Sequence, residues 1–167
     1  MTSAILCATV TILTMLALPT IASRYGSDVG GRFLERTGKY DAGTLRGWVD
    51  AHPREARAYA FPVLFPLDVL FMAALTAFVS FGSISEAHMA GLGTGRSWVF
   101  LLLPVAYVTA DLVEDSLLAA MLTHPDWIGD GVVLLTTRIT QLKLATATLS
   151  LFQVLALSVL AAPRVHQ

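Results

Sequence analysis

Six ionisable residues lie within long apolar stretches of this sequence: Asp68, Asp111, Glu114, Asp115, Arg138 and Lys143. A charged side chain at the centre of a bilayer costs about 2.5–3.5 kcal/mol on insertion scales, so such groups face one another or a polar cavity. Crowded carboxylates retain protons that isolated ones release, and they can act as general acids, proton carriers or ligands of a hard cation. These residues therefore predict acid–base or cation chemistry.

The composition of the chain excludes several classes of protein. Of its 167 residues, 55% are hydrophobic and 14% charged, the formal net charge is −1, and the mean hydropathy is +0.67. This balance excludes a disordered chain, and 11 Lys and Arg against 12 Asp and Glu lack the basic surplus of a nucleic-acid binder. The single cysteine, Cys7, excludes a disulfide framework, a cysteine zinc site and a redox pair within one chain.

Four predominantly apolar stretches are long enough to cross about 30 Å of hydrocarbon. They cover residues 4–22, 62–83, 97–122 and 133–161, which predicts an all-α polytopic membrane protein with residues 1–167 forming one four-helix transmembrane domain. The first stretch has no Lys or Arg before it, so we expect a retained helix rather than a cleaved signal peptide. Pro62 and Pro66 predict a bend where the second span enters the bilayer.

The connection 24–58 is long and holds seven of the eleven basic residues. Asp41 can cap a short helix in which Leu45, Trp48 and Val49 recur at helical spacing, so an interfacial helix is expected there. Pro53 fits the first position of a further helix that leads into the second span. The positive-inside rule places this loop in the cytoplasm of a multi-pass cell-membrane protein.

The topology predicts that the six charges meet in one half of the bilayer, because the loops that join the relevant span ends lie on the same side. Tyr107, Asp111 and Glu114 share a face of the third span, whereas Arg138 is turned about 140° from Lys143 on the fourth and should pair with Asp115 or Glu114. We expect Asp68, Tyr107, Asp111 and Glu114 to be catalytic. The expected binding or charge-tuning residues are Arg57, Tyr59, Asp115, Arg138, Thr140 and Lys143.

Several catalytic classes find no support in the residues. All four histidines fall in loops or the tail, so none is available to activate a buried serine or to build a zinc site. The glycine-rich segment 91–95 lacks the preceding strand and the lysine of a phosphate-binding loop. We therefore expect no cofactor and no metal.

The favoured hypothesis is acid–base catalysis, such as isomerisation, cyclisation or hydration, on a lipophilic small molecule drawn from the membrane lipid. Asp111 and Glu114 would be acid and base, with Asp68 and Lys143 setting their charge states. Two alternatives stay open. The cluster could serve a proton- or cation-coupled transporter or channel subunit, which with four spans requires a homo-oligomer, or its ion pairs could be architectural in a non-catalytic membrane scaffold.

Overall fold

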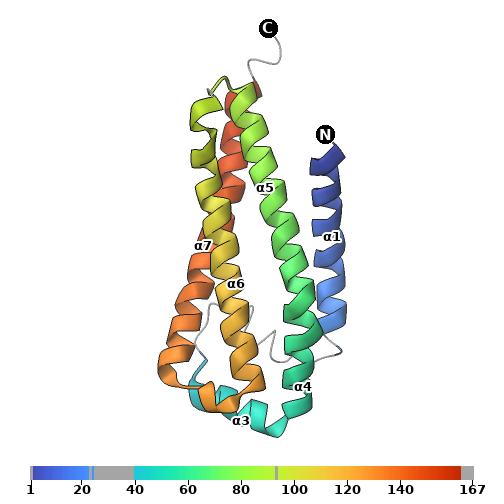
Figure 1. Cartoon of the computed structure of the whole chain (residues 1–167), viewed down its shortest axis with the longest axis vertical. Helices are drawn as coiled ribbons and strands as arrows, with labels where there is room; N and C mark the ends of the chain where they lie inside the picture. Colours follow the sequence, from blue (N-terminus) through green and yellow to red (C-terminus); the bar gives the residue numbers. More distant parts are fainter. Residues whose placement is uncertain (1, 23, 25–39, 93, 163–167) are drawn as a thin grey trace.

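The computed structural model describes residues 2–22, 24, 40–92 and 94–162, and within these ranges it is helical without any strand. Its elements are α1 (Thr2–Ala22), α3 (Ala42–Ala51), α4 (Pro53–Ala58), η2 (Tyr59–Asp68), α5 (Val69–Met89), η3 (Thr94–Leu101), α6 (Leu102–Thr123), η4 (Pro125–Trp127) and α7 (Asp130–Ala161). Figure 1 shows the long helices side by side, with α3 across one end of the bundle. Four of the basic residues that bear on the predicted orientation lie outside the described residues: Arg32, Arg36, Lys39 and Arg164.

Three helices of the described chain are long and apolar enough to cross a membrane: Pro53–Met89, Ser97–Thr123 and Asp130–Ala161. They contain the second, third and fourth expected spans. The first expected span, 4–22, is helical within α1 and packs beside α5, but by length and composition the structure supports three spans rather than four. The second expected span ends at residue 83, but α5 continues to Met89. The connection to the third span is therefore shorter than the expected 84–96.

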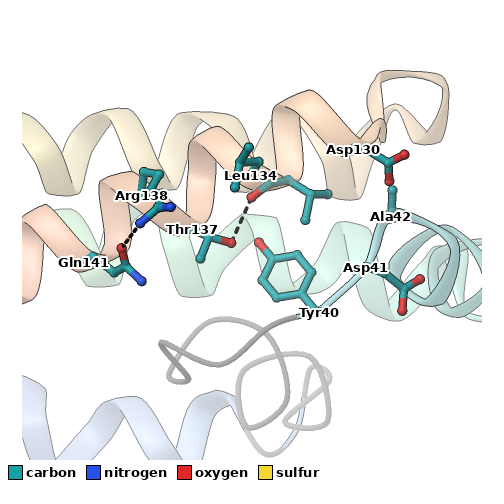
Figure 2. Close-up of a pocket in the computed structure, with 9 residues that line it drawn as sticks. Tyr40, Asp41, Ala42, Asp130, Leu134, Thr137, Arg138 and Gln141 are labelled. Carbon is teal, nitrogen blue, oxygen red and sulfur yellow. Dashed lines mark hydrogen bonds between the residues drawn. The ribbon is translucent and has the colours of Figure 1, made fainter.

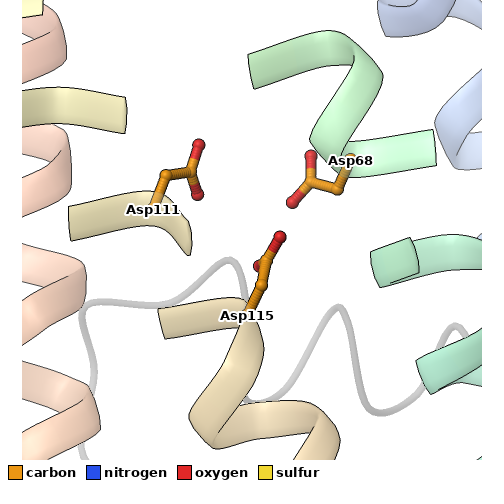
Figure 3. A group of neighbouring side chains, drawn as sticks. All are labelled: Asp68, Asp111 and Asp115. Atoms are coloured by element: carbon orange, nitrogen blue, oxygen red, sulfur yellow. The ribbon is translucent and has the colours of Figure 1, made fainter. Parts of the chain in front are cut away.

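The segment Pro53–Met89 is interrupted in the middle by η2. Phe61 (φ −137°, ψ 110°) and Phe65 (φ −124°, ψ 116°) leave the helical conformation, and each directly precedes a proline. A proline ring disfavours the helical conformation of the residue before it, so the predicted bend is confirmed at both prolines. The consequence for the site is that Asp68 lies where regular helix resumes, with its carboxylate directed towards α6 (Figure 3).

The short helix expected after Asp41 is confirmed and closes one end of the bundle. The Asp41 carboxylate accepts a 2.7 Å hydrogen bond from the Thr44 backbone N–H, as an N-cap residue does. Leu45 and Val49 are each 1% exposed and belong to the main hydrophobic core, together with Ile128 from the connection between α6 and α7. The same core contains Leu122 at the end of α6 and Val133 at the start of α7, so it packs α3 against the α6–α7 connection.

The opposite end of the bundle is fastened by neutral hydrogen bonds. The Gln153 side-chain N on α7 donates to Ser83 Oγ on α5 and to the Phe100 carbonyl oxygen, both at 2.8 Å. Gly82 allows α5 and α7 to approach closely, since a Cβ there would meet a methyl group of Val154 at 3.3 Å. Both amide protons of Gln153 are used in these contacts, so this end is closed by packing and satisfied polar groups.

We expect Leu45→Ala to lower the free energy of unfolding by about 2–5 kcal/mol, because the substitution leaves a cavity in the core beneath α3. Thermal or denaturant unfolding of the purified protein in one fixed micelle measures the change. Leu92→Ala is the matched control, since Leu92 is 41% exposed and should change stability by no more than about 0.5 kcal/mol. Equal effects of the two substitutions would contradict the docking of α3.

Candidate functional site

A single lysine connects two carboxylates across α6 and α7. Lys143 Nζ lies 2.5 Å from Asp111 Oδ1 and 2.8 Å from Glu114 Oε2. Asp111 and Glu114 are three residues apart on α6 and therefore share a face of that helix. Both carboxylate side chains are 1–2% exposed, whereas that of Lys143 is 21% exposed. The ammonium group thus bridges two buried anions and ties α6 to α7.

Glu114 is held on its other oxygen by a threonine of the same helix as Lys143. The Thr140 hydroxyl is hydrogen-bonded to Glu114 Oε1, and it also lies 3.0 Å from the Thr136 carbonyl oxygen. A hydroxyl has one proton, so donation to Glu114 competes with donation to Thr136. Thr136 is 1% and Thr140 7% exposed, so both threonines of α7 lie inside the bundle.

Three aspartates meet on the side of this cluster that faces η2. One carboxylate oxygen from each of Asp68, Asp111 and Asp115 lies within 4.8 Å of the other two. Figure 3 shows Asp68 approaching from the start of α5 and the other two from successive turns of α6. Asp111 and Asp115 are each 1% exposed and Asp68 is partly exposed. Asp68 thus lies beside two aspartates that follow it by 43 or more positions in the sequence, as the order of the spans predicts.

The cluster carries more negative than positive charge. Four carboxylates (Asp68, Asp111, Glu114 and Asp115) and one ammonium (Lys143) have a formal charge of −3 when all are ionised. Both salt bridges among the described residues join Lys143 to Asp111 and Glu114, so neither Asp68 nor Asp115 takes part in one. Like charges this close in an apolar surrounding cannot all remain ionised, so protons or a cation must be held there.

Tyr107 occupies the position expected for it, one turn from Asp111 on α6. It is 3% exposed and lies close enough to Asp111 for the two groups to interact electrostatically. The phenol is thus a direct neighbour of the Asp111 carboxylate inside the bundle.

The expected pairing of Arg138 with Glu114 or Asp115 is absent from the described structure. Its guanidinium is exposed and donates to Gln141 Oε1 at 3.2 Å. Figure 2 shows Arg138 in the lining of a pocket of about 380 Å³, together with Tyr40, Asp41 and Asp130. The physical reason is the helical rotation between Arg138 and Lys143: only one of the two can face α6. The formal charge of the cluster is consequently −3, whereas four carboxylates with both Lys143 and Arg138 would give −2.

Two of the expected charge-tuning residues, Arg57 and Tyr59, lie on the chain segment that leads to Asp68. Arg57 on α4 is exposed. Tyr59 is 5% exposed and belongs to the hydrophobic core at the α3 end. Asp68, nine residues further along the same chain segment, is the residue that this irregular stretch delivers to the site.

Tyr40, which precedes α3, is a neighbour of the cluster that no motif or spacing in the sequence predicts. Burial of its ring raises the pKa of Tyr40 to about 12, and the negative charge of Glu114 adds to the rise, so the side chain is near the acidic cluster. The phenol therefore stays protonated at neutral pH. No signal in the sequence relates residue 40 to residue 114, because their proximity depends on how α3 docks across the bundle.

Comparison with known proteins finds no family model, curated protein or solved structure that matches this chain. The chemistry of the site must therefore be argued from its own geometry. Lys143 forms salt bridges with Asp111 and Glu114, whereas Asp68 and Asp115 take part in none among the described residues. A proton acceptor beside carboxyl groups that must hold a proton or a cation is suited to proton transfer or to cation binding.

We expect Lys143→Met to lower the free energy of unfolding by about 3–5 kcal/mol, because it leaves Asp111 and Glu114 buried without their counter-charge. Unfolding in a fixed micelle measures the loss. A second substitution, Asp111→Asn, should restore part of it by removing one unpaired charge.

Arg138→Met is the control for Lys143→Met, since Arg138 is exposed and should change stability by no more than about 0.5 kcal/mol. A larger loss in the Arg138 variant than in the Lys143 variant would show that the basic partner of the cluster has been assigned to the wrong residue.

Proposed function

We propose that this chain is a four-helix integral membrane protein in which α1 is the fourth span. Support comes from the 21 residues of α1, which contain no charged side chain, and from its packing along α5. We further propose that the end carrying α3 faces the cytoplasm of the cell membrane, following the basic residues of the connection 24–58. The charged cluster then lies in the cytoplasmic half of the bilayer.

The proposed activity of the cluster is acid–base catalysis on a lipophilic small molecule, by isomerisation, cyclisation or hydration. The observation that carries this proposal is that the ammonium group of Lys143 forms salt bridges with two of the four carboxylates, which separates the four into two pairs. Lys143 forms salt bridges with Asp111 and Glu114. Asp68 and Asp115 lack such a contact and are close together, so a proton is held between them. Neighbouring groups thus differ in protonation, as an acid and a base must.

This geometry favours a different acid from the one that spacing alone suggests. Because Asp111 and Glu114 share the same ammonium, neither is the natural proton donor, and the donor role passes to the pair of Asp68 and Asp115. Glu114 is the base, oriented by Lys143 and by the Thr140 hydroxyl. Tyr107 donates a hydrogen bond to an oxygen atom of the bound molecule.

The proton balance of an isomerisation needs no cofactor. The carboxyl pair of Asp68 and Asp115 gives its proton to one carbon of a double bond, and Glu114 removes a proton from a carbon next to the resulting positive centre. The double bond moves and the cluster gains as many protons as it loses. Proton return from Glu114 to the aspartate pair, directly or through water, restores the starting state.

A lipophilic molecule can approach the cluster from the side of α7. Among the three ion-paired residues, Lys143 has the most exposed side chain. Its neighbours in the sequence, Leu142 and Leu144, are 54% and 42% exposed. The surface around the entry is thus apolar and suited to lipid. A transport path would instead need polar groups through the other half of the bundle, where the Gln153 amide protons are already taken up by Ser83 and Phe100. This contact favours catalysis over transport.

Solvent deuterium provides a test that does not require the substrate to be known. The purified protein in lipid nanodiscs is incubated in D₂O with a non-saponifiable lipid extract, and the lipids are analysed by mass spectrometry. Wild-type protein should introduce carbon-bound deuterium into at least one lipid. Glu114→Gln should reduce the rate by at least about 100-fold, as expected for loss of a general base.

Asp126→Asn is the matched control for the deuterium experiment, because Asp126 is exposed and lies in η4 outside the cluster. It should label lipids at the wild-type rate. Labelling that persists unchanged in Glu114→Gln would exclude the proposed base. Absence of labelling by the wild type across extracts would favour an architectural role for the cluster.

A further inference from the structure

The convergence of three aspartates has a second consequence, which does not depend on catalysis. Asp68, Asp111 and Asp115 each present one oxygen to a common point, and these oxygens are at most 4.8 Å apart. Oxygen atoms at this separation can all reach one ion at the distances of about 2.0–2.6 Å that Mg²⁺ and Ca²⁺ adopt. The geometry is therefore that of a partial coordination shell contributed by two segments distant in the sequence.

Unpartnered oxygens provide an independent indication of a ligand. Asp111 Oδ2 and Asp115 Oδ2 are buried and have no hydrogen-bond partner among the described residues. Both side chains belong to residues that are 1% exposed, and Figure 3 shows their carboxylates turned towards the space shared with Asp68. A buried acceptor without a partner is destabilising by about 1–3 kcal/mol, and more when it is charged, so native structures rarely leave one unsatisfied.

One proton is not enough to neutralise this group. With one proton between Asp68 and Asp115, the cluster still has a formal charge of −2, because Lys143 offsets only one of the remaining carboxylates. A charge of this size is unfavourable in an apolar surrounding. A divalent cation at the same position supplies two positive charges and satisfies the unpartnered oxygens at once.

We infer that Asp68, Asp111 and Asp115 bind one hard divalent cation of the Mg²⁺, Mn²⁺ or Ca²⁺ class. The ligand set is oxygen only, which suits these ions and disfavours the softer transition metals that prefer nitrogen or sulfur. Lys143 holds Asp111 through Oδ1, so Oδ2 of that residue remains for the ion. Water or a lipid oxygen completes the coordination shell.

Binding of the ion excludes the proton that the proposed catalysis assigns to Asp68 and Asp115, because both use the same oxygens. The two states of the site are therefore in competition, and a bound cation suppresses acid catalysis. Cation affinity should fall as the pH falls, and ion binding should release protons into weakly buffered solution. The inference itself concerns binding alone and stands whether or not the cluster is catalytic.

The test is a Mn²⁺ titration of the full-length protein in nanodiscs of uncharged phosphatidylcholine, followed by the electron paramagnetic resonance signal of free Mn²⁺. Wild-type protein should remove one Mn²⁺ per chain from solution, and excess Mg²⁺ or Ca²⁺ should displace it. Asp115→Asn keeps the shape of the side chain and removes a ligand charge. It should weaken binding at least about tenfold, the lower end of what loss of even an outer-shell partner costs.

Two further variants make the result decisive. Asp126→Asn removes an exposed carboxylate and should bind Mn²⁺ like the wild type. Asp68→Asn changes a partly exposed ligand and replaces Asp115→Asn if that variant does not fold, as judged by size-exclusion chromatography and circular dichroism. Wild-type protein that binds no stoichiometric Mn²⁺ would overturn the inference. So would a folded Asp115 or Asp68 variant with unchanged affinity.

The outcome is separable from the test of catalysis. Deuterium incorporation is measured with and without a chelator of divalent cations, and Mn²⁺ binding is measured without a lipid substrate. Labelling without cation binding would overturn the cation site and leave the acid–base function intact. Cation binding without labelling would support the site and overturn the catalytic proposal.

Discussion

The bundle depends on the placement of one ammonium group between two carboxylates on a facing helix. Lys143 reaches Asp111 and Glu114 at 2.5 and 2.8 Å, and this contact sets the rotation of α7 against α6. In an apolar surrounding the separated charges would each be strongly unfavourable, so few other rotations of the two helices are accessible. The partner choice has a further effect: among the described residues it leaves Asp68 and Asp115 without a salt bridge of their own.

Two structural features flank this contact and keep it in place. On one side, the prolines of η2 interrupt the helix so that Asp68 is delivered at the start of α5, opposite Asp111 and Asp115. On the other side, the side-chain amide of Gln153 on α7 is hydrogen-bonded to Ser83 on α5 and to Phe100 in η3. The contact between α5 and α7 at Gln153 is thus made by neutral hydrogen bonds, whereas the contact between α6 and α7 at Lys143 is made by charged groups.

Periodicity and capping rules predict much of this fold from the sequence. The end of the connection 24–58 folds as expected, with Asp41 as N-cap and Leu45 and Val49 buried, because such patterns act over a few residues. The meeting of Asp68 with Asp111 is also predictable, since alternating spans bring defined helix ends to the same side. The position of Tyr40 near Glu114 is not, because it depends on the docking of α3, for which no short-range pattern exists.

The sequence by itself determined that the chain is helical, where its apolar segments lie and which ionisable residues fall within them. Only the tertiary structure decided how those charges are partnered. On one helix the rotation of about 100° per residue separates Arg138 from Lys143, but which of them faces α6 depends on the packing of both helices. The structure turns Lys143 inwards and Arg138 to the surface, where it bonds to Gln141. This choice changes the formal charge of the cluster from −2, for four carboxylates with two bases, to −3, for four carboxylates with Lys143 alone.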